Sequence, residues 1–189
     1  CLPKISEYET ALGQNQDLYQ AFETLANSDE FNTLSMAQKK SINNSLRDFR
    51  LFGVALADDK KSQFAKLSKQ LSEITSQFGD QVMDATDAWS HLISDAAELV
   101  GLPDSALSLA KQAAETKGKE GYLLTLDAPS YIPVMVHCEN RALRKQLSLA
   151  MTTRASDKGP QAGQFDNSQL MVQILSLRKA LAQLLSFPN

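Results

Sequence analysis

Apolar residues recur every three or four positions along most of the chain, which is the spacing of a helix with one buried face. The longest such run covers residues 58–87 and contains no proline, and its apolar positions are Phe64, Leu67, Leu71, Ile74, Phe78 and Val82. We expect one long helix there. Because the loop at residues 53–57 is short, this helix is expected to fold back on the preceding helix as an antiparallel hairpin, with a parallel coiled-coil dimer as the alternative.

Shorter helices are predicted on both sides of the long one. Ser35 with Gln38, and Asp166 with Gln169, have the spacing of a capping box at the start of a helix. The predicted helices are residues 2–13, 15–27, 35–51, 106–116, 130–138, 140–154 and a final helix after Asp166. Four of them carry a clear apolar stripe, formed by Leu2, Ile5, Tyr8 and Leu12, by Leu18, Phe22 and Leu25, by Ile42, Leu46 and Phe49, and by Leu170, Ile174, Leu177, Leu181 and Leu184.

Two short segments alternate apolar and polar residues, which is the pattern of β-strands. They are residues 89–94 and residues 121–127, and in the second Tyr122, Leu124 and Leu126 share one face. We expect the two strands to pair around the helical segment that follows Pro103. The predicted fold class is mainly α, a multi-helix lobe with a long antiparallel helical hairpin and one small two-stranded β-ribbon.

Composition and charge narrow the possible functions. The chain has 189 residues, of which 43% are hydrophobic and 22% are charged, and this is typical of a folded globular lobe. We expect a single lobe over residues 1–189. The formal net charge of -3 argues against a nucleic-acid partner, and the cationic stretch at residues 141–158 is interpreted as a solvated face. Without an apolar run of roughly 18 residues, no membrane partner is expected and the protein is predicted to be cytoplasmic.

The first residue is Cys1 instead of Met, which indicates a piece of a longer or processed chain. Lipidation of Cys1 is the less favoured alternative, because the helical pattern begins at once, with no polar tether. The second cysteine, Cys138, is far away in sequence, so two reduced thiols are expected instead of a disulfide.

The residues offer little catalytic chemistry. A zinc enzyme needs about three converging protein ligands, and this chain has only two histidines, His91 and His137. His137 and Cys138 are neighbours on one predicted helix, so their side chains point in different directions. Cys138 with His91 as a nucleophile and base is a weak possibility, because Cys138 ends an apolar stretch. We therefore assign no catalytic, cofactor-binding or metal-binding residue.

Three stretches resemble a known family: "LPKISEYETALGQNQDLYQAF", "GYLLTLDAPSYIPVM" and "TTRASDKGPQAGQFDNSQLMVQILSLRKALAQLLSF". In matching order they are similar to the amino-terminal helical part of the thimet oligopeptidase family of zinc metallopeptidases. The resemblance covers nearly the whole chain. Its most specific pieces are residues 154–157, 159–160 and 166–168.

The resemblance implies a role for a longer parent protein. Members of this family cleave short, unstructured peptides with zinc held by a His-Glu-x-x-His helix and a downstream Glu. This chain has no such motif, so none of those residues can be assigned here. The implied active site lies beyond Asn189, and the chain would form one wall of the substrate channel.

The partners implied by the resemblance are the remainder of the parent polypeptide and short peptide substrates. Zinc would be the parent's cofactor, with none in this chain, and the chain alone would be inactive. The loop at residues 155–165 is interpreted as a connection between helices, with substrate contact as the alternative. A self-contained helical module that binds partner proteins is the competing hypothesis for the whole chain.

Overall fold

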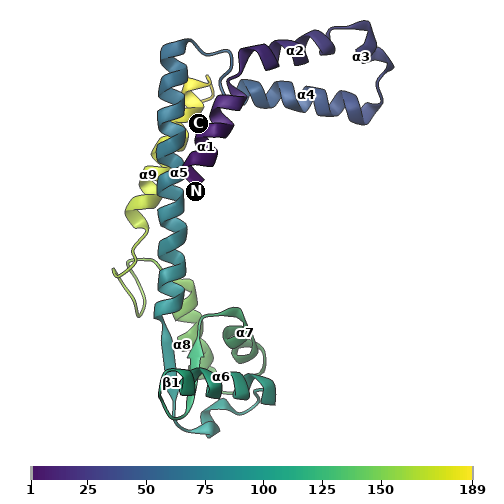
Figure 1. Ribbon diagram of the computed structural model, residues 1–189. Helices are drawn as coiled ribbons and strands as arrows, with labels where there is room; N and C mark the ends of the chain where they lie inside the picture. The colour runs from purple at the N-terminus through teal and green to yellow at the C-terminus, as the bar shows by residue number, and fades with distance from the viewer. Residues whose placement is uncertain (1, 189) are drawn as a thin grey trace. The chain divides into compact units, whose positions relative to one another are not determined.

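The computed structural model describes residues 2–188 (Figure 1), so the expectations about Cys1 lie outside the described residues. The elements in this part of the chain are α1 (Leu2–Gly13), α2 (Gln16–Ala26), α3 (Asp29–Thr33), α4 (Met36–Leu51), α5 (Asp58–Ala88), β1 (Ser90–Ile93), the 3₁₀-helix η1 (Ala96–Leu99), α6 (Asp104–Thr116), β2 (Tyr122–Thr125), α7 (Ala128–His137), α8 (Arg141–Thr152) and α9 (Ser168–Leu184). The predicted mainly helical fold with one two-stranded ribbon is confirmed.

The described residues divide into two compact units. The first comprises residues 2–76 and 170–188, and the second comprises residues 77–169. One boundary therefore falls inside α5, and the other lies at the beginning of α9.

In the first unit, α4 packs against α2 (Figure 1). The predicted buried face of α4 is confirmed, and the Phe49 ring lies against the rings of Tyr19 and Phe22. The predicted capping box is also present, because Ser35 accepts from the Gln38 N–H while the Gln38 side chain accepts from the Ser35 N–H.

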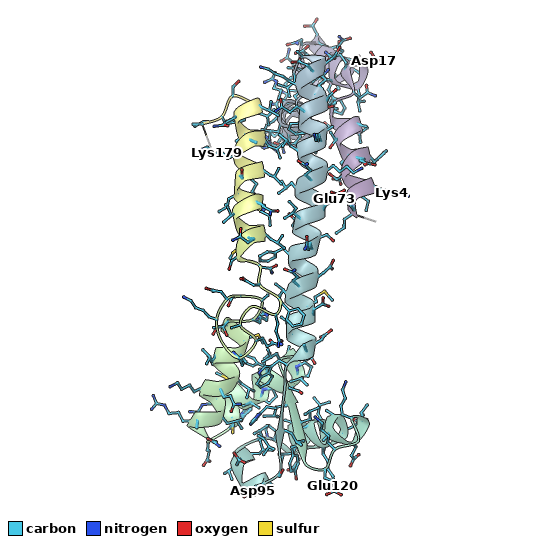
Figure 2. All side chains as sticks on the ribbon, turned by 90° about the vertical axis from the view of Figure 1, so that its left-hand side faces the viewer. Lys4, Asp17, Glu73, Asp95, Glu120 and Lys179 are labelled. Atoms are coloured by element: carbon cyan, nitrogen blue, oxygen red, sulfur yellow. The ribbon has the colours of Figure 1, made fainter. Side chains whose placement is uncertain are left out.

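The long helix α5 has other neighbours than the sequence predicted. Residues 35–51 were expected to form an antiparallel hairpin with residues 58–87, but the apolar face of α4 is already covered by α2. Within the first unit, α5 lies between α1 and α9 (Figure 2), where Lys4, Glu73 and Lys179 mark α1, α5 and α9.

One ion pair joins α1 to α5 on the surface of the first unit. Lys69 Nζ lies 2.6 Å from Glu7 Oε1, and about half of each side chain is exposed. The hydrogen bond and the attraction between the opposite charges lower the pKa of Glu7 and raise the pKa of Lys69. Because an exposed pair is screened by water, we attribute little stability to it.

The second unit is built on the antiparallel ribbon of β1 and β2. His91 is opposite Leu124 and Ile93 is opposite Tyr122. The predicted shared face of β2 is confirmed, because Leu124 and Leu126 are buried and Tyr122 packs against them. Helices α6, α7 and α8 complete the core, whose buried members are Trp89, Ile93, Leu99, Leu102, Ala106, Ala110, Leu124, Leu126, Val134, Cys138, Leu143, Leu147 and Ala150.

Gly121, directly before β2, is expected to tolerate a larger residue poorly. Its φ is +112°, and a Cβ atom would lie 2.4 Å from the Ile93 carbonyl oxygen of the paired strand. Gly118 also has a positive φ, of +66°, but a Cβ there would meet no atom within 4 Å. Gly121→Ala should therefore cost about 1–3 kcal/mol more than Gly118→Ala, because the clash adds to the backbone strain.

Urea unfolding followed by tryptophan fluorescence measures this difference. The chain has one tryptophan, Trp89, and it lies in the core of the second unit, so its emission reports on that unit. Equal losses of stability in the two glycine variants would contradict the steric explanation.

Candidate functional site

The structure gives His91, His137 and Cys138 separate surroundings in the second unit. His91 stacks on Trp89 with 6.3 Å between ring centroids, and its Nδ1 lies 3.2 Å from Gln146 Nε2. His137 is exposed at the end of α7, whereas Cys138 is buried and its thiol faces the Glu98 carbonyl oxygen at 3.6 Å. Cys138 and His91 thus contact other groups, and these contacts do not join the two residues as a nucleophile and base.

The residues present do not fit a zinc ion. Within residues 2–188 no group of three or more His, Cys, Asp or Glu side chains is arranged to hold a metal. Zinc sites in proteins use about three or four such ligands.

The predicted cationic stretch at the end of the second unit is partly used for structure. Arg144 donates a hydrogen bond to the Cys138 carbonyl oxygen, and Arg154 donates to the Met151 carbonyl oxygen at 2.6 Å. Arg141, Lys145 and Lys158 are exposed. This agrees with a solvated face.

The loop between α8 and α9 is fixed by a buried amide that the sequence did not single out as structural. Asn167 is 1% exposed, and its Nδ2 donates to the Phe78 carbonyl oxygen of α5 at 3.1 Å. Its backbone N–H also donates to the Ala155 carbonyl oxygen. No spacing rule marks such a residue, because its partners lie far away in sequence or at an irregular turn.

The start of α9 differs in detail from the predicted capping box. Asp166 Oδ1 accepts from the Ser168 N–H at 2.9 Å and from Ser168 Oγ at 2.6 Å, where we predicted a reciprocal pair with Gln169. These hydrogen bonds stabilise the carboxylate and lower the pKa of Asp166. The Asp166 carboxylate therefore stabilises the start of α9 by accepting these hydrogen bonds.

A groove in the first unit combines apolar walls with charged groups. It has a volume of about 410 Å³ and lies between α1, α2 and α4. Its apolar walls are Leu12, Leu18, Phe22, Phe49 and Phe52.

Only Leu12 of the apolar stripe of α1 lines this groove, whereas Leu2 and Ile5 line a separate recess between α1 and α5. Leu2, Ile5, Tyr8 and Leu12 are 44–67% exposed, whereas Thr10 and Gly13 are the buried residues of this helix. The sequence pattern of α1 resembles a core face, which is why the groove was missed. Small residues allow α1 to pack through its other face, so the apolar stripe is left open.

None of the helices within residues 2–188 has the length and apolar character that a membrane span requires.

Comparison with known proteins identifies relatives of the chain. Residues 2–61 match the family described as Neurolysin/Thimet oligopeptidase, N-terminal domain. The chain is 54% identical to oligopeptidase A of Haemophilus influenzae over 99% of its length, and 51% identical to oligopeptidase A of Escherichia coli over 100%. A probable cytosolic oligopeptidase A of Arabidopsis thaliana is 40% identical over 99% of the chain.

The chain spans only 28% of the length of each bacterial relative and 27% of the plant one. The resemblance inferred from its sequence is confirmed by these matches. The chain belongs to the neurolysin and thimet oligopeptidase family, and it is similar along its whole length to the amino-terminal part of oligopeptidase A.

Proposed function

We propose that this chain is the amino-terminal helical part of a zinc-dependent oligopeptidase, in which it forms one wall of the substrate channel. The observation that carries the proposal is the identity of 51–54% to bacterial oligopeptidases A along nearly the entire chain. The proposed substrates are short, unstructured peptides, and the proposed partner is the remainder of the polypeptide. A cytoplasmic location is part of the proposal, supported by the name of the plant relative.

The role proposed for this part is steric. Helices that lie side by side, as α5 does with α1 and α9 in the first unit (Figure 2), can form a wall. Such a surface can admit a flexible peptide and exclude a folded domain. Zinc held by the rest of the protein would supply the activated water that attacks the peptide bond. The residues described here would guide access to that site.

Size selection tests this role in the longer protein that contains the chain. A short unstructured peptide with a cleavable sequence is compared with a stable domain that carries the same sequence in an exposed loop. We expect hydrolysis of the free peptide and none of the loop. Cleavage of both at similar rates would contradict a channel that excludes folded chains.

The competing hypothesis of a self-contained interaction module makes a different prediction. Such a module would bind a protein partner in the absence of the remaining polypeptide, and the longer protein would show no peptidase activity. The relatives that match nearly the whole chain are named oligopeptidases, and this supports the first hypothesis.

A further inference from the structure

We propose that the groove between α1, α2 and α4 is a docking site for a peptide segment that carries a large apolar side chain next to Lys or Arg. The groove is defined by the walls Leu12, Leu18, Phe22, Phe49 and Phe52. It lies entirely in the first unit. The proposal concerns binding and does not require that the bound peptide be cleaved.

The aromatic walls are held in place before any ligand arrives. Phe49 is buried, with its ring centroid 5.7 Å from that of Phe22 and 6.0 Å from that of Tyr19. Phe52 packs on Gly13 so closely that a Cβ at that position would lie 2.3 Å from the Phe52 ring. A wall fixed in this way loses little conformational entropy when it binds.

The groove has the size and character of a site that can take a large apolar side chain. Its volume of about 410 Å³ falls in the range of roughly 300–1,000 Å³ that ligand pockets occupy. An aromatic side chain gains most from such a site, because it can bury about 150–250 Å² of surface. Leu12, which is 44% exposed, lies at the edge where an entering side chain would cover it.

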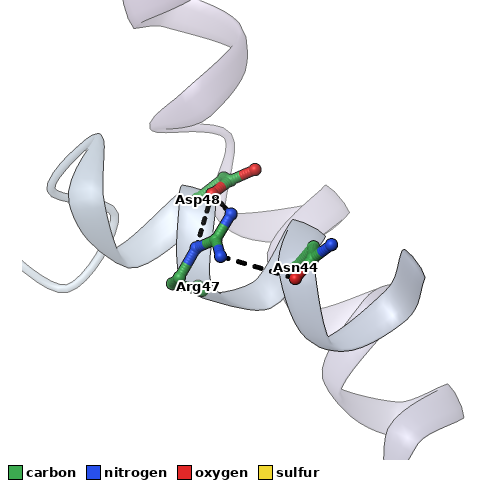
Figure 3. A network of polar contacts seen from close by, with 3 residues as sticks. All are labelled: Asn44, Arg47 and Asp48. Atoms are coloured by element: carbon green, nitrogen blue, oxygen red, sulfur yellow. Dashed lines mark hydrogen bonds and ion pairs between the residues drawn. The ribbon is translucent and has the colours of Figure 1, made fainter. Parts of the chain in front are cut away.

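The charged residues around the groove determine which peptide residue is favoured next to the bound apolar side chain. The ionisable residues that line it are two carboxylates, Glu9 and Asp48. Within residues 2–188 the ion pairs do not involve Glu9. Asp48 receives two hydrogen bonds from Arg47 on one oxygen only, and its second oxygen points away from the guanidinium (Figure 3).

These carboxylates favour a cationic peptide over other apolar ligands. A Lys or Arg beside the buried side chain can pair with Glu9 and with the free oxygen of Asp48. An anionic lipid headgroup or a nucleic acid would instead meet like charge. A peptide segment that enters the groove beside Leu12 would place both groups at once.

Fluorescence anisotropy with labelled peptides tests the proposal on the full chain of residues 1–189. The probe is a short peptide with Phe between two Lys residues, compared with one peptide in which Phe is replaced by Ala and one in which both Lys are replaced by Glu. We expect the probe to bind at least about tenfold more tightly than either comparison peptide, a difference of about 1.4 kcal/mol. Its affinity should fall as salt is added, because salt screens the carboxylates.

A matched pair of variants locates the binding. Leu12→Asn changes the groove edge, whereas Leu51→Asn changes a leucine of nearly equal exposure, 42% against 44%, that does not line the groove. We expect the first to weaken binding about tenfold and the second to leave it unchanged. Glu9→Gln together with Asp48→Asn should reduce the salt dependence.

Three results would overturn the proposal. They are no binding of the probe at millimolar concentration, equal binding of the Lys and Glu peptides, and equal binding by the Leu12→Asn and Leu51→Asn variants. The same two variants are also compared in the longer protein. Both variants keep the active site there, so a difference in peptide binding between them reports on the groove. Because binding is the readout, a failure here leaves the proposed peptidase role intact.

Discussion

Asn167→Asp is expected to destabilise the second unit by about 3 kcal/mol or more near neutral pH, although the two side chains have almost the same shape. Asn167 is 1% exposed, and its Nδ2 donates to the Phe78 carbonyl oxygen. A carboxylate at this position has no N–H to donate. It would place a negative charge against that carbonyl oxygen at a buried position, and an unpaired buried charge is costly.

The loss should depend on pH in a defined direction. Burial and the facing carbonyl raise the pKa of the new carboxyl group above the value of about 3.9 that Asp has in an unfolded chain. The folded form is then least penalised below the unfolded pKa, where the carboxyl is protonated and can donate its own O–H to the Phe78 oxygen. As the pH rises through the folded pKa, that stability is lost.

Urea unfolding followed by Trp89 fluorescence, repeated from about pH 4 to about pH 8, measures this effect. Gln112→Glu is the matched control, because it makes the same change from amide to carboxylate on the exposed surface of α6. We expect the control to stay within about 0.5 kcal/mol of the parent chain. A loss in Asn167→Asp that is the same at every pH would show that the buried charge is not its cause.

Leu147→Ala is expected to cost about 3–5 kcal/mol, since it opens a cavity in the core of the second unit. Leu147 is 0% exposed and lies on α8 among the core residues that also include Val134 and Leu143. The helices and the ribbon around it can move inward only in part. The lost contacts are therefore not replaced.

Leu149→Ala, two residues further along the same helix, is the control. Leu149 is 50% exposed, so the same deletion there removes few contacts and should cost well below about 1 kcal/mol. Both variants are compared by urea unfolding with Trp89 emission. Equal losses would mean that helix propensity, and not core packing, sets the stability at these positions.

The periodicity of the sequence predicted most of the helices and strands, because each of them buries the residues of one face and these residues recur at regular spacing. Residues 58–87 and 35–51 contain regular apolar spacing or a capping box, and both helices are found. The two elements that were missed, α3 and η1, have only five and four residues, which is too short to show a period. In these segments the chain turn is set by local hydrogen bonds.

The partners of the helices were harder to predict than the helices themselves. An apolar stripe shows which face of a helix is suited to burial, but not which neighbour covers it. The face of α4 met α2 instead of α5, and the stripe of α1 from Leu2 to Leu12 stays 44–67% exposed. The groove could not be predicted for the same reason, since Leu12, Phe22 and Phe49 come from three helices.

The absence of assigned catalytic residues remains a prediction from the two histidines of the sequence. The structure adds that the thiol of Cys138 and the ring of His91 have separate partners. The buried Asn167 shows the opposite limit, because it belongs to a stretch that carries the family resemblance, yet no spacing rule marked its structural role. Polar residues of irregular loops depend on distant partners, so a single sequence rarely reveals them.

The central claim is that this chain shapes access to a peptidase active site while the rest of the protein performs the chemistry. The most direct measurement is the zinc content and peptide turnover of purified residues 1–189 beside those of the longer protein. We expect no stoichiometric zinc and no hydrolysis from the chain, with zinc and hydrolysis in the longer protein. A tightly bound zinc ion in residues 1–189, together with cleavage of a short peptide, would contradict the claim.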